Sequence, residues 1–226
     1  MIHSYRRTLF VVAACALALV VLPAVASAAC SASGSAGHVN LPPGGGGYDG
    51  PAELHAYLNS GGVLTLELQI QHGFFLNTVA QPGGLLGGER ETFDSSLVVT
   101  AIGQGPLAGW SRTLTVPAKC VTDTAPHKAG DPIQDFDTNM YSIVGALSND
   151  PDFASFKVVA GTGNGFDSPG HTTAYLQKDG SFVVDSTFQI GYSISYVGSP
   201  GGKLAGMSGS TEGNITMTCN PAGPQK

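Results

Sequence analysis

The chain has 226 residues, only 12% of them charged, and its 10 lysines and arginines are outnumbered by 16 aspartates and glutamates. Proteins that bind nucleic acid carry clustered basic residues, so this composition argues against a nucleic-acid partner. Lysine and glutamate are also too scarce for a coiled coil or a helical bundle. Because 42% of the residues are hydrophobic, the chain can bury a core, and its length allows one large or two small domains.

The first 28 residues have the three parts of a secretory signal peptide. Arg6 and Arg7 precede an uncharged apolar stretch from Leu9 to Leu22, and small residues follow up to Ala28. We therefore expect cleavage after Ala28 and a secreted product, located outside the cell, at its surface or in the periplasm. A membrane anchor is the alternative, because the apolar stretch approaches the length that spans a bilayer. No later segment is apolar enough to span, so we predict no transmembrane segment after cleavage.

Three cysteines, Cys30, Cys120 and Cys219, follow the signal peptide, and export permits a disulfide. Three thiols cannot all pair within one chain. We prefer Cys120–Cys219 as the bridge, and the alternatives join Cys30 to either of the other two or place a lipid on it. No two cysteines have the C-x-x-C spacing of a zinc or redox site, so we expect neither a metal nor a cofactor.

From Val63 onward the chain consists mainly of short segments in which apolar and polar residues alternate. The clearest of them are residues 63–71 and 188–196, and Asp179-Gly180 between two apolar runs is typical of a hairpin turn. Further strands are expected at residues 97–102, 112–116, 141–147, 156–159, 172–177, 181–185 and 214–219. Only residues 51–58 have the character of a short helix. The pattern predicts an all-β, antiparallel sandwich or barrel, most similar to a jelly roll.

Two parts of the sequence repeat each other. Asp94-Ser95, Gly105, Leu107-Ala108-Gly109, Ser111 and Cys120 recur in the same order as Asp185-Ser186, Gly202, Leu204-Ala205-Gly206, Ser208 and Cys219. We interpret the repeat as two tandem similar β halves, and chance matching of small residues is the alternative. The predicted organisation is a signal peptide (1–28), a Gly/Pro/Ser-rich lead-in (29–50), the two halves (51–125 and 126–222) and a tail (223–226).

His171 is the strongest catalytic candidate, because it lies between a turn and a predicted strand. As a general base it would need a nucleophile and a carboxylate, for which Asp137 and Asp185 are the candidates. The chain has no G-x-S-x-G nucleophile elbow, so we interpret His171 as a hydrogen-bonded structural residue. The glycine-rich segment 161–165 is not followed by the lysine of a phosphate-binding loop.

Acidic and aromatic residues offer two further candidate sites. Aspartates near residues 131–137 and 150–152 could bind calcium, but their spacing matches no EF-hand loop and is typical of turns. Trp110, Tyr192 and Tyr196 could line a site for a carbohydrate or an apolar ligand, although such residues lie more often in a core.

Three segments resemble parts of uncharacterised secreted bacterial proteins: Phe136-Asp137-Thr138, Ser168–Thr173 and Asp185-Ser186-Thr187-Phe188. In those proteins an F-D-T strand start precedes a D-S-F-F strand, and Thr187 here replaces the first of the two phenylalanines. The resemblance covers about residues 130–218, implies an exported β-domain and transfers no catalytic residue.

We therefore expect an exported, non-catalytic β-domain protein that acts as a cell-surface, matrix or ligand-binding component, with self-association or a surface ligand as its partner. The alternative is a secreted hydrolase on a β-sandwich that uses His171 with a nearby carboxylate.

Overall fold

The computed structural model describes residues 30–219 except 33, 36–37, 40–46 and 55–63. The predicted signal peptide and the tail lie outside the described residues. The described part of the chain is built from antiparallel strands and two single 3-10 turns, which confirms the predicted all-β class. Among these residues, no helix has the length and apolar character needed to cross a membrane.

The strands, in chain order, are β1 (Ser31–Ala32), β2 (Gly34–Ser35), β3 (His38–Val39), β4 (Gly47–Leu54), β5 (Leu66–Pro82), β6 (Glu89–Gly103), β7 (Ser111–Thr124), β8 (Ile133–Ser148), β9 (Phe153–Ala160), β10 (Pro169–Leu176), β11 (Phe182–Gly198) and β12 (Ser208–Cys219). The 3-10 turns are η1 (Gly105–Leu107), between β6 and β7, and η2 (Thr162–Asn164), between β9 and β10.

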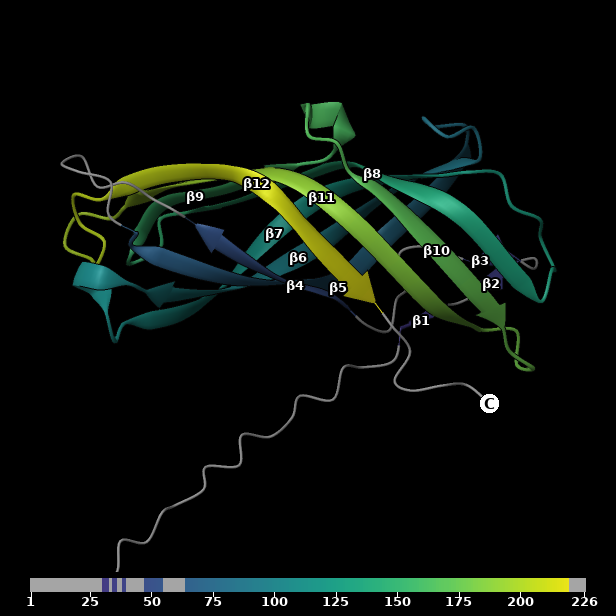
Figure 1. The fold of residues 1–226 in the computed structure, drawn as a ribbon, viewed down its shortest axis with the longest axis horizontal. Helices are drawn as coiled ribbons and strands as arrows, with labels where there is room; N and C mark the ends of the chain where they lie inside the picture. Colours follow the sequence, from purple (N-terminus) through teal and green to yellow (C-terminus); the bar gives the residue numbers. More distant parts are fainter. Residues whose placement is uncertain (1–29, 33, 36–37, 40–46, 55–63, 220–226) are drawn as a thin grey trace, which may run out of the picture.

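Ten of the described strands form one sheet that closes on itself. The order of adjacent strands in the sheet is β11, β10, β8, β7, β6, β5, β4 and β12. The last of these, β12, also pairs with the first, β11, and this pairing closes the sheet. β9 and β10 lie one after the other between β8 and β11: β10 pairs with the first part of each of these strands and β9 with the last part. Figure 1 shows β9 to β12 passing in front of β5, β6 and β7. The closed sheet gives the molecule an inside and an outside.

Alternation along the strands sends apolar side chains to the inside. Leu66 and Leu68 on β5 are fully buried, and at the same end of the interior Phe153, Phe156 and Tyr196 stack edge to face. The register places polar side chains together farther along the interior. The buried polar residues on these strands include His72, Glu91, Ser95, Thr122, Gln134, Thr138, Thr172 and Ser186. The core is therefore apolar at one end and partly polar at the other.

The predicted strands are correct in kind but too short. Residues 181–185 and 188–196, predicted as separate runs, form the single strand β11, and the predicted strand at 63–71 extends as β5 to Pro82. The turn predicted at Asp179-Gly180 is present, with Gly180 at φ 84° and its N–H bonded to the Gln177 carbonyl. The added part of β5 lacks a regular alternation, because a bulge at Phe74 interrupts it and every residue from Leu76 to Pro82 is exposed.

The helix predicted at 51–58 is wrong over residues 51–54, and residues 55–58 lie outside the described part. Residues 47–54 form β4, in which Pro51 pairs with Gln69 of β5. Pairing along the whole of β4 with the adjacent strand holds this segment extended. Local helical character is a weak preference that tertiary contacts override.

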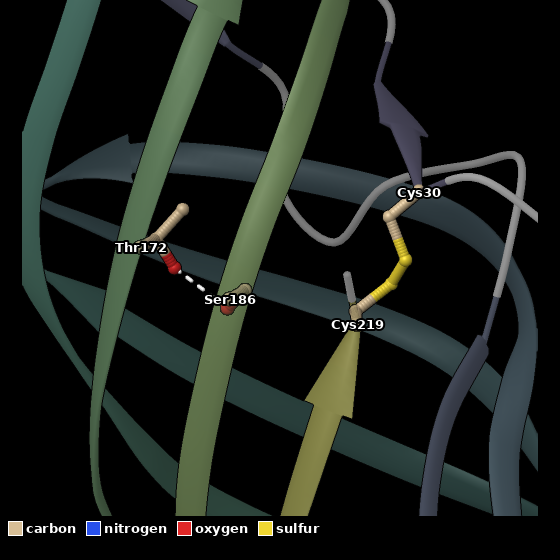
Figure 2. Close-up of a disulfide and its surroundings, with 4 residues drawn as sticks. All are labelled: Cys30, Thr172, Ser186 and Cys219. Atoms are coloured by element: carbon tan, nitrogen blue, oxygen red, sulfur yellow. Dashed lines mark hydrogen bonds between the residues drawn. A yellow bond between two sulfur atoms is a disulfide. The ribbon is translucent and has the colours of Figure 1, made fainter. Parts of the chain in front are cut away.

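The preferred disulfide Cys120–Cys219 is also wrong, because the bridge joins Cys30 to Cys219 with a Cα–Cα distance of 5.8 Å (Figure 2). Cys120 is on β7, which β6, β5 and β4 separate from β12 in the sheet order. Val184 of β11 donates its N–H to the Cys30 carbonyl at 2.9 Å, and Ser186 pairs with Cys219. The bridge therefore connects the end of β12 to the start of β1 along the same edge of β11.

The hairpins β6–β7 and β11–β12 turn in the same way. The Gly103 N–H donates to the Trp110 carbonyl at 2.7 Å, and the Gly198 N–H donates to the Met207 carbonyl at 2.8 Å. In both turns a Cβ on the first glycine would meet the carbonyl oxygen of a leucine. The equivalent pairs are Gly103 and Gly198, Gly105 and Gly202, Leu107 and Leu204, Ala108 and Ala205, and Gly109 and Gly206. The two turns thus share their closing hydrogen bonds, whereas the second is two residues longer and Gly202 lacks the positive φ of Gly105.

Candidate functional site

His171 lies on the outer face of the sheet, between two carboxylates of the neighbouring strand. Its Nδ1 is 3.0 Å from Asp137 Oδ1, and its Nε2 is 2.8 Å from Asp135 Oδ1. The Thr173 hydroxyl donates to the same Asp135 oxygen at 2.7 Å. β10 and β8 pair in register with His171 opposite Asp137, which places all of these side chains on one surface. We call His171, Asp135 and Asp137 the outer histidine cluster.

The charge of the outer cluster follows from its geometry. Two hydrogen bonds to carboxylates require an N–H on each ring nitrogen, which only the protonated imidazole has. The hydrogen bonds to Asp137 and Asp135 raise the pKa of His171 above 6.5. The hydrogen bonds from Thr173 and His171 lower the pKa of Asp135. Neither nitrogen of His171 is therefore directed at a hydroxyl that it could activate.

The structure thus brings His171 and Asp137 together, whereas Asp185 lies on β11, the other neighbour of β10, two residues from the Thr187 that pairs with His171. Asp185 is exposed on β11, opposite Thr173. The predicted carboxylate contact is present for Asp137, while about half of the His171 side chain faces solvent. Within the described residues, no group of three or more histidine, cysteine or acidic side chains could hold a metal ion.

The aspartates considered as calcium ligands make contacts within the protein. Arg112 donates to Asp152 at 2.6 Å and also pairs with Asp150. The Asp150 carboxylate accepts the N–H groups of Asp152 and Phe153, as expected of a turn-forming aspartate. Asp131 pairs with Lys128 at 3.5 Å. These side chains stabilise turns by contacts that the chain itself supplies.

A second cluster lies inside the closed sheet, at its polar end. His72 Nε2 is 2.8 Å from Ser95 Oγ and 3.6 Å from Cys120 Sγ, and Ser95 Oγ is 3.2 Å from Cys120 Sγ. The three residues come from the adjacent strands β5, β6 and β7, and all three are buried. We call His72, Ser95 and Cys120 the inner histidine cluster.

Burial keeps the inner cluster uncharged. Loss of solvent lowers the pKa of His72 to about 4, since the buried imidazolium would lack hydration. Loss of solvent also raises the pKa of the Cys120 thiol to about 12. The thiolate is the reactive form of cysteine, so a thiol this difficult to ionise is a poor nucleophile. The inner cluster is suited to hydrogen bonding rather than to covalent chemistry.

Beside the inner cluster lies a small cavity with mostly aromatic walls. Its lining residues are Tyr48, His72, Phe75, Phe93, Thr122, Met140 and Phe188. The rings pack edge to face, with centroids 5.5 Å apart for Tyr48 and Phe188 and 5.6 Å apart for Phe75 and Phe93. The free space is about 10 Å³, close to what one buried water occupies. In this conformation the cavity is nearly filled by its own walls.

A bulge in β5 places Phe75 in this wall. The register between β5 and β6 shifts between Gly73 and Leu76, and Phe74 has φ 57°. Such a left-handed conformation is unfavourable for a bulky residue. It interrupts the alternation, so that Phe75 faces inward and Phe74 faces solvent. Phe75 is also the most exposed of the lining residues, at 9%, and thus separates the cavity from solvent.

The sequence reasoning did not identify the inner cluster, although one signal for it was present. His72 continues the alternating series of Leu66, Leu68 and Ile70, so it belongs to the inward face of the same strand. Its proximity to Ser95 and Cys120 depends on the order of three strands, which the series does not give. Of the aromatic candidates, Tyr192 and Tyr196 are buried, and Trp110 packs against the core beside Phe153.

Comparison of the chain with protein-family models, with curated proteins and with solved structures finds no significant similarity. The functional interpretation therefore rests on the geometry of the two clusters and of the cavity.

Proposed function

We propose that the protein is an exported, non-catalytic binding protein that holds a small aromatic molecule with one polar group in the cavity beside His72. The observation that carries this proposal is the joint lining of the cavity by aromatic rings and a few polar side chains. Small-molecule sites typically have this composition, with apolar walls for affinity and a few polar groups for orientation.

The aromatic walls define the class of ligand. A flat ring entering between Phe93 and Phe188 would find ring edges and faces of the kind with which aromatic side chains pair favourably. The surrounding rings already contact one another in this way, with His72 and Phe75 at a centroid distance of 5.0 Å. An aliphatic ligand would lack these ring–ring contacts and would bind more weakly. A strongly charged ligand would also bind more weakly, because charge is costly to bury without a partner.

Two hydroxyls provide the polar contact. Thr122 Oγ1 donates to the Met140 sulfur at 3.6 Å, and a thioether is a weak acceptor. A ligand oxygen or nitrogen is a stronger acceptor than the Met140 sulfur and would take its place as the partner of the Thr122 hydroxyl. Ser95 lies next to the cavity through its bond to His72, and its hydroxyl can both donate and accept. One polar group on the ligand is enough to use these partners.

Phe75 is the side chain that we expect to move when a ligand enters. The cavity of about 10 Å³ is too small for an aromatic ring, so one wall must shift. Phe75 follows Phe74, whose backbone has φ 57°, and strain of this kind tends to occur at ligand-binding segments. A ligand ring would take the place of the Phe75 ring against Tyr48 and Phe93.

Calorimetric titration with indole tests this function, since indole is one small aromatic molecule with one N–H. Thr122→Ile fills the cavity and removes the hydroxyl, so we expect it to abolish the binding that the unmodified protein shows. Thr115→Ile is the matched control, because Thr115 is on the same strand but faces solvent. Equal loss of binding in both variants, or no binding by the unmodified protein, would contradict the proposal.

The proposed export is supported by the sequence of residues 1–28 and by the Cys30–Cys219 bridge. Structural disulfides persist in oxidising compartments and are rare in the cytosol. A cell-surface, periplasmic or extracellular location is compatible with both features. Mass spectrometry of the exported chain, with and without reductant, would measure the cleavage site and the bridge together.

We further propose that residues 51–125 and 126–222 are tandem halves that pack as the two layers of a sandwich or jelly-roll-like body. β4 to β7 are neighbours in the sheet, and so are β8 to β12, so each half supplies a continuous part of it. The matching turns that contain Gly103 and Gly198 support a common origin.

The alternative function, a hydrolase that uses His171, has one supporting observation, the contact with Asp137. A general base uses one nitrogen for the orienting carboxylate and the other for the nucleophile. In the outer cluster the second nitrogen contacts Asp135 instead. We therefore favour ligand binding, and hydrolysis of a test ester that is lost in His171→Ala would reverse this preference.

A further inference from the structure

The β5–β6 hairpin exposes a concentration of apolar side chains. Four of the eight large apolar residues that are exposed in the described structure lie within it, namely Phe74, Leu76, Val79 and Leu85. Their exposed fractions are between 52% and 67%. Residues 73–88 contain no charged side chain, although the protein as a whole carries a net charge of −6. Clustered apolar exposure without charge is typical of a contact surface.

Among the residues that the structure describes, no strand pairs with one edge of the backbone of this segment. β4 pairs with β5 as far as Gly73, and beyond that residue the pairing partner of β5 in the described structure is β6 alone. From Leu76 to Pro82 every β5 residue is exposed, while on the other side of the hairpin β6 remains paired with β7 as far as Arg90. An exposed strand edge is a template for pairing with another chain.

We propose that residues 74–82 of β5 form a contact between two copies of this chain. In a symmetric pair the same surface contacts itself, so any charge in it would face a like charge. The absence of charge from residues 73–88 removes that repulsion, while the acidic remainder of the chain opposes contact elsewhere. Phe74, Leu76 and Val79 would be buried against their counterparts. This inference is independent of ligand binding in the cavity.

In the proposed dimer, burial of side chains contributes more to the stability of the contact than backbone hydrogen bonds do. The register of β5 shifts twice, between Gly73 and Leu76 and between Leu76 and Val79. Pro82 lacks an N–H, so the ladder that two copies could form is limited to a few residues. Burial of apolar side chains does not depend on an uninterrupted ladder. The association is therefore expected to weaken when a single side chain is made charged.

Sedimentation velocity of the exported chain, with its disulfide intact, tests the proposal over a range of concentrations. We expect a dimer that dissociates on dilution and a monomer at all concentrations for both Val79→Lys and Val79→Glu. Mixing these two variants should restore a dimer, because opposite charges then meet at the contact. Circular dichroism would show that both variants keep the strand content of the unmodified chain.

Val197→Lys is the matched control, since Val197 is an exposed valine on β11, away from the hairpin. We expect this variant to dimerise like the unmodified chain. A monomeric unmodified chain at all concentrations would overturn the proposal, as would a dimer that survives Val79→Lys. Loss of the dimer in Val197→Lys would assign the contact to another surface and would overturn it equally.

Discussion

Arg90 holds Asp123 through two parallel hydrogen bonds, Nε to Oδ1 and Nη2 to Oδ2, each of 2.7 Å. The Asp123 side chain has no exposed surface, and its Oδ2 also accepts the N–H of Leu85 at 2.9 Å. The Arg90 guanidinium lies over the Tyr141 ring, 4.0 Å from its centroid. This pair connects the β5–β6 turn to β7 and so fixes the turn end of the hairpin that carries the proposed self-contact.

Asp123→Ala is expected to lower the free energy of unfolding by about 2 kcal/mol. Breaking a fully buried ion pair costs about 3–5 kcal/mol, but the partly exposed Arg90 can regain water. Urea denaturation measures the change. Lys119→Ala is the control, because Lys119 pairs with Asp94 on the exposed surface, where such pairs contribute little. Equal effects of the two substitutions would contradict this account.

Gly103→Ala and Gly198→Ala are expected to destabilise the protein by similar amounts, about 1–3 kcal/mol each. In each turn the added methyl group would meet the carbonyl oxygen of a leucine, Leu107 in one and Leu204 in the other. Thermal or urea unfolding of the two variants tests the equivalence of the turns. A large effect at one glycine and none at the other would show that the repeated motif does not specify one geometry.

The outer histidine cluster is expected to make stability depend on pH. Hydrogen bonds to Asp137 and Asp135 raise the pKa of His171 above the 6.5 that applies to the unfolded chain. Its contribution is therefore fully present below pH 6.5 and is lost as the pH rises through the higher folded-state pKa. NMR titration of the imidazole protons measures this value directly.

Asp137→Asn is expected to lower the pKa of His171 toward 6.5, because it removes the largest of the causes that raise it. In the same spectra His72 serves as an internal control. Burial lowers its pKa to about 4, so its signals should not titrate near neutral pH. A His171 that titrates below 6.5 in the unmodified protein would show that the outer cluster does not form.

Reduction of the Cys30–Cys219 bridge is expected to lower the free energy of unfolding by about 3–5 kcal/mol. The bridge joins residues 189 positions apart, and closing so long a loop restricts the unfolded chain strongly. Cys219→Ser and Cys30→Ser should have the same effect as each other. Non-reducing mass spectrometry of Cys120→Ser should still find the bridge, and its loss there would restore the pairing first predicted from the sequence.

The sequence predicts those parts of the fold that depend on local alternation. Leu64 to Ile70 indicate a strand with one buried face, and Asp179-Gly180 indicates the turn between β10 and β11. Neither signal predicts that the sheet closes, because closure depends on the pairing of β12 with β11 and with β4. The sequence left the pairing of Cys30 with Cys219 as an alternative but did not select it, since this pairing follows from β1 lying beside β11.

The candidate site was predicted only in part, for a similar reason. The sequence singled out His171 and Asp137, which β10 and β8 place 3.0 Å apart, but it also favoured Asp185, which lies on the other side of β10, opposite Thr173. The inner cluster required the order of β5, β6 and β7, and the position of Phe75 in the cavity wall required a bulge at Phe74. A bulge reverses which residues face inward, and alternation along the sequence does not reveal it.

The central claim is that a small aromatic molecule binds in the cavity beside His72. The most direct measurement is an NMR titration with indole of protein labelled at its methionine methyl groups. Met140 lines the cavity, whereas Met207 lies in the β11–β12 turn, at the opposite end of β11 from the lining residue Phe188. We predict a saturable shift of the Met140 methyl signal with little change at Met207. An unchanged Met140 signal, or equal shifts of both methyl groups, would contradict the proposed site.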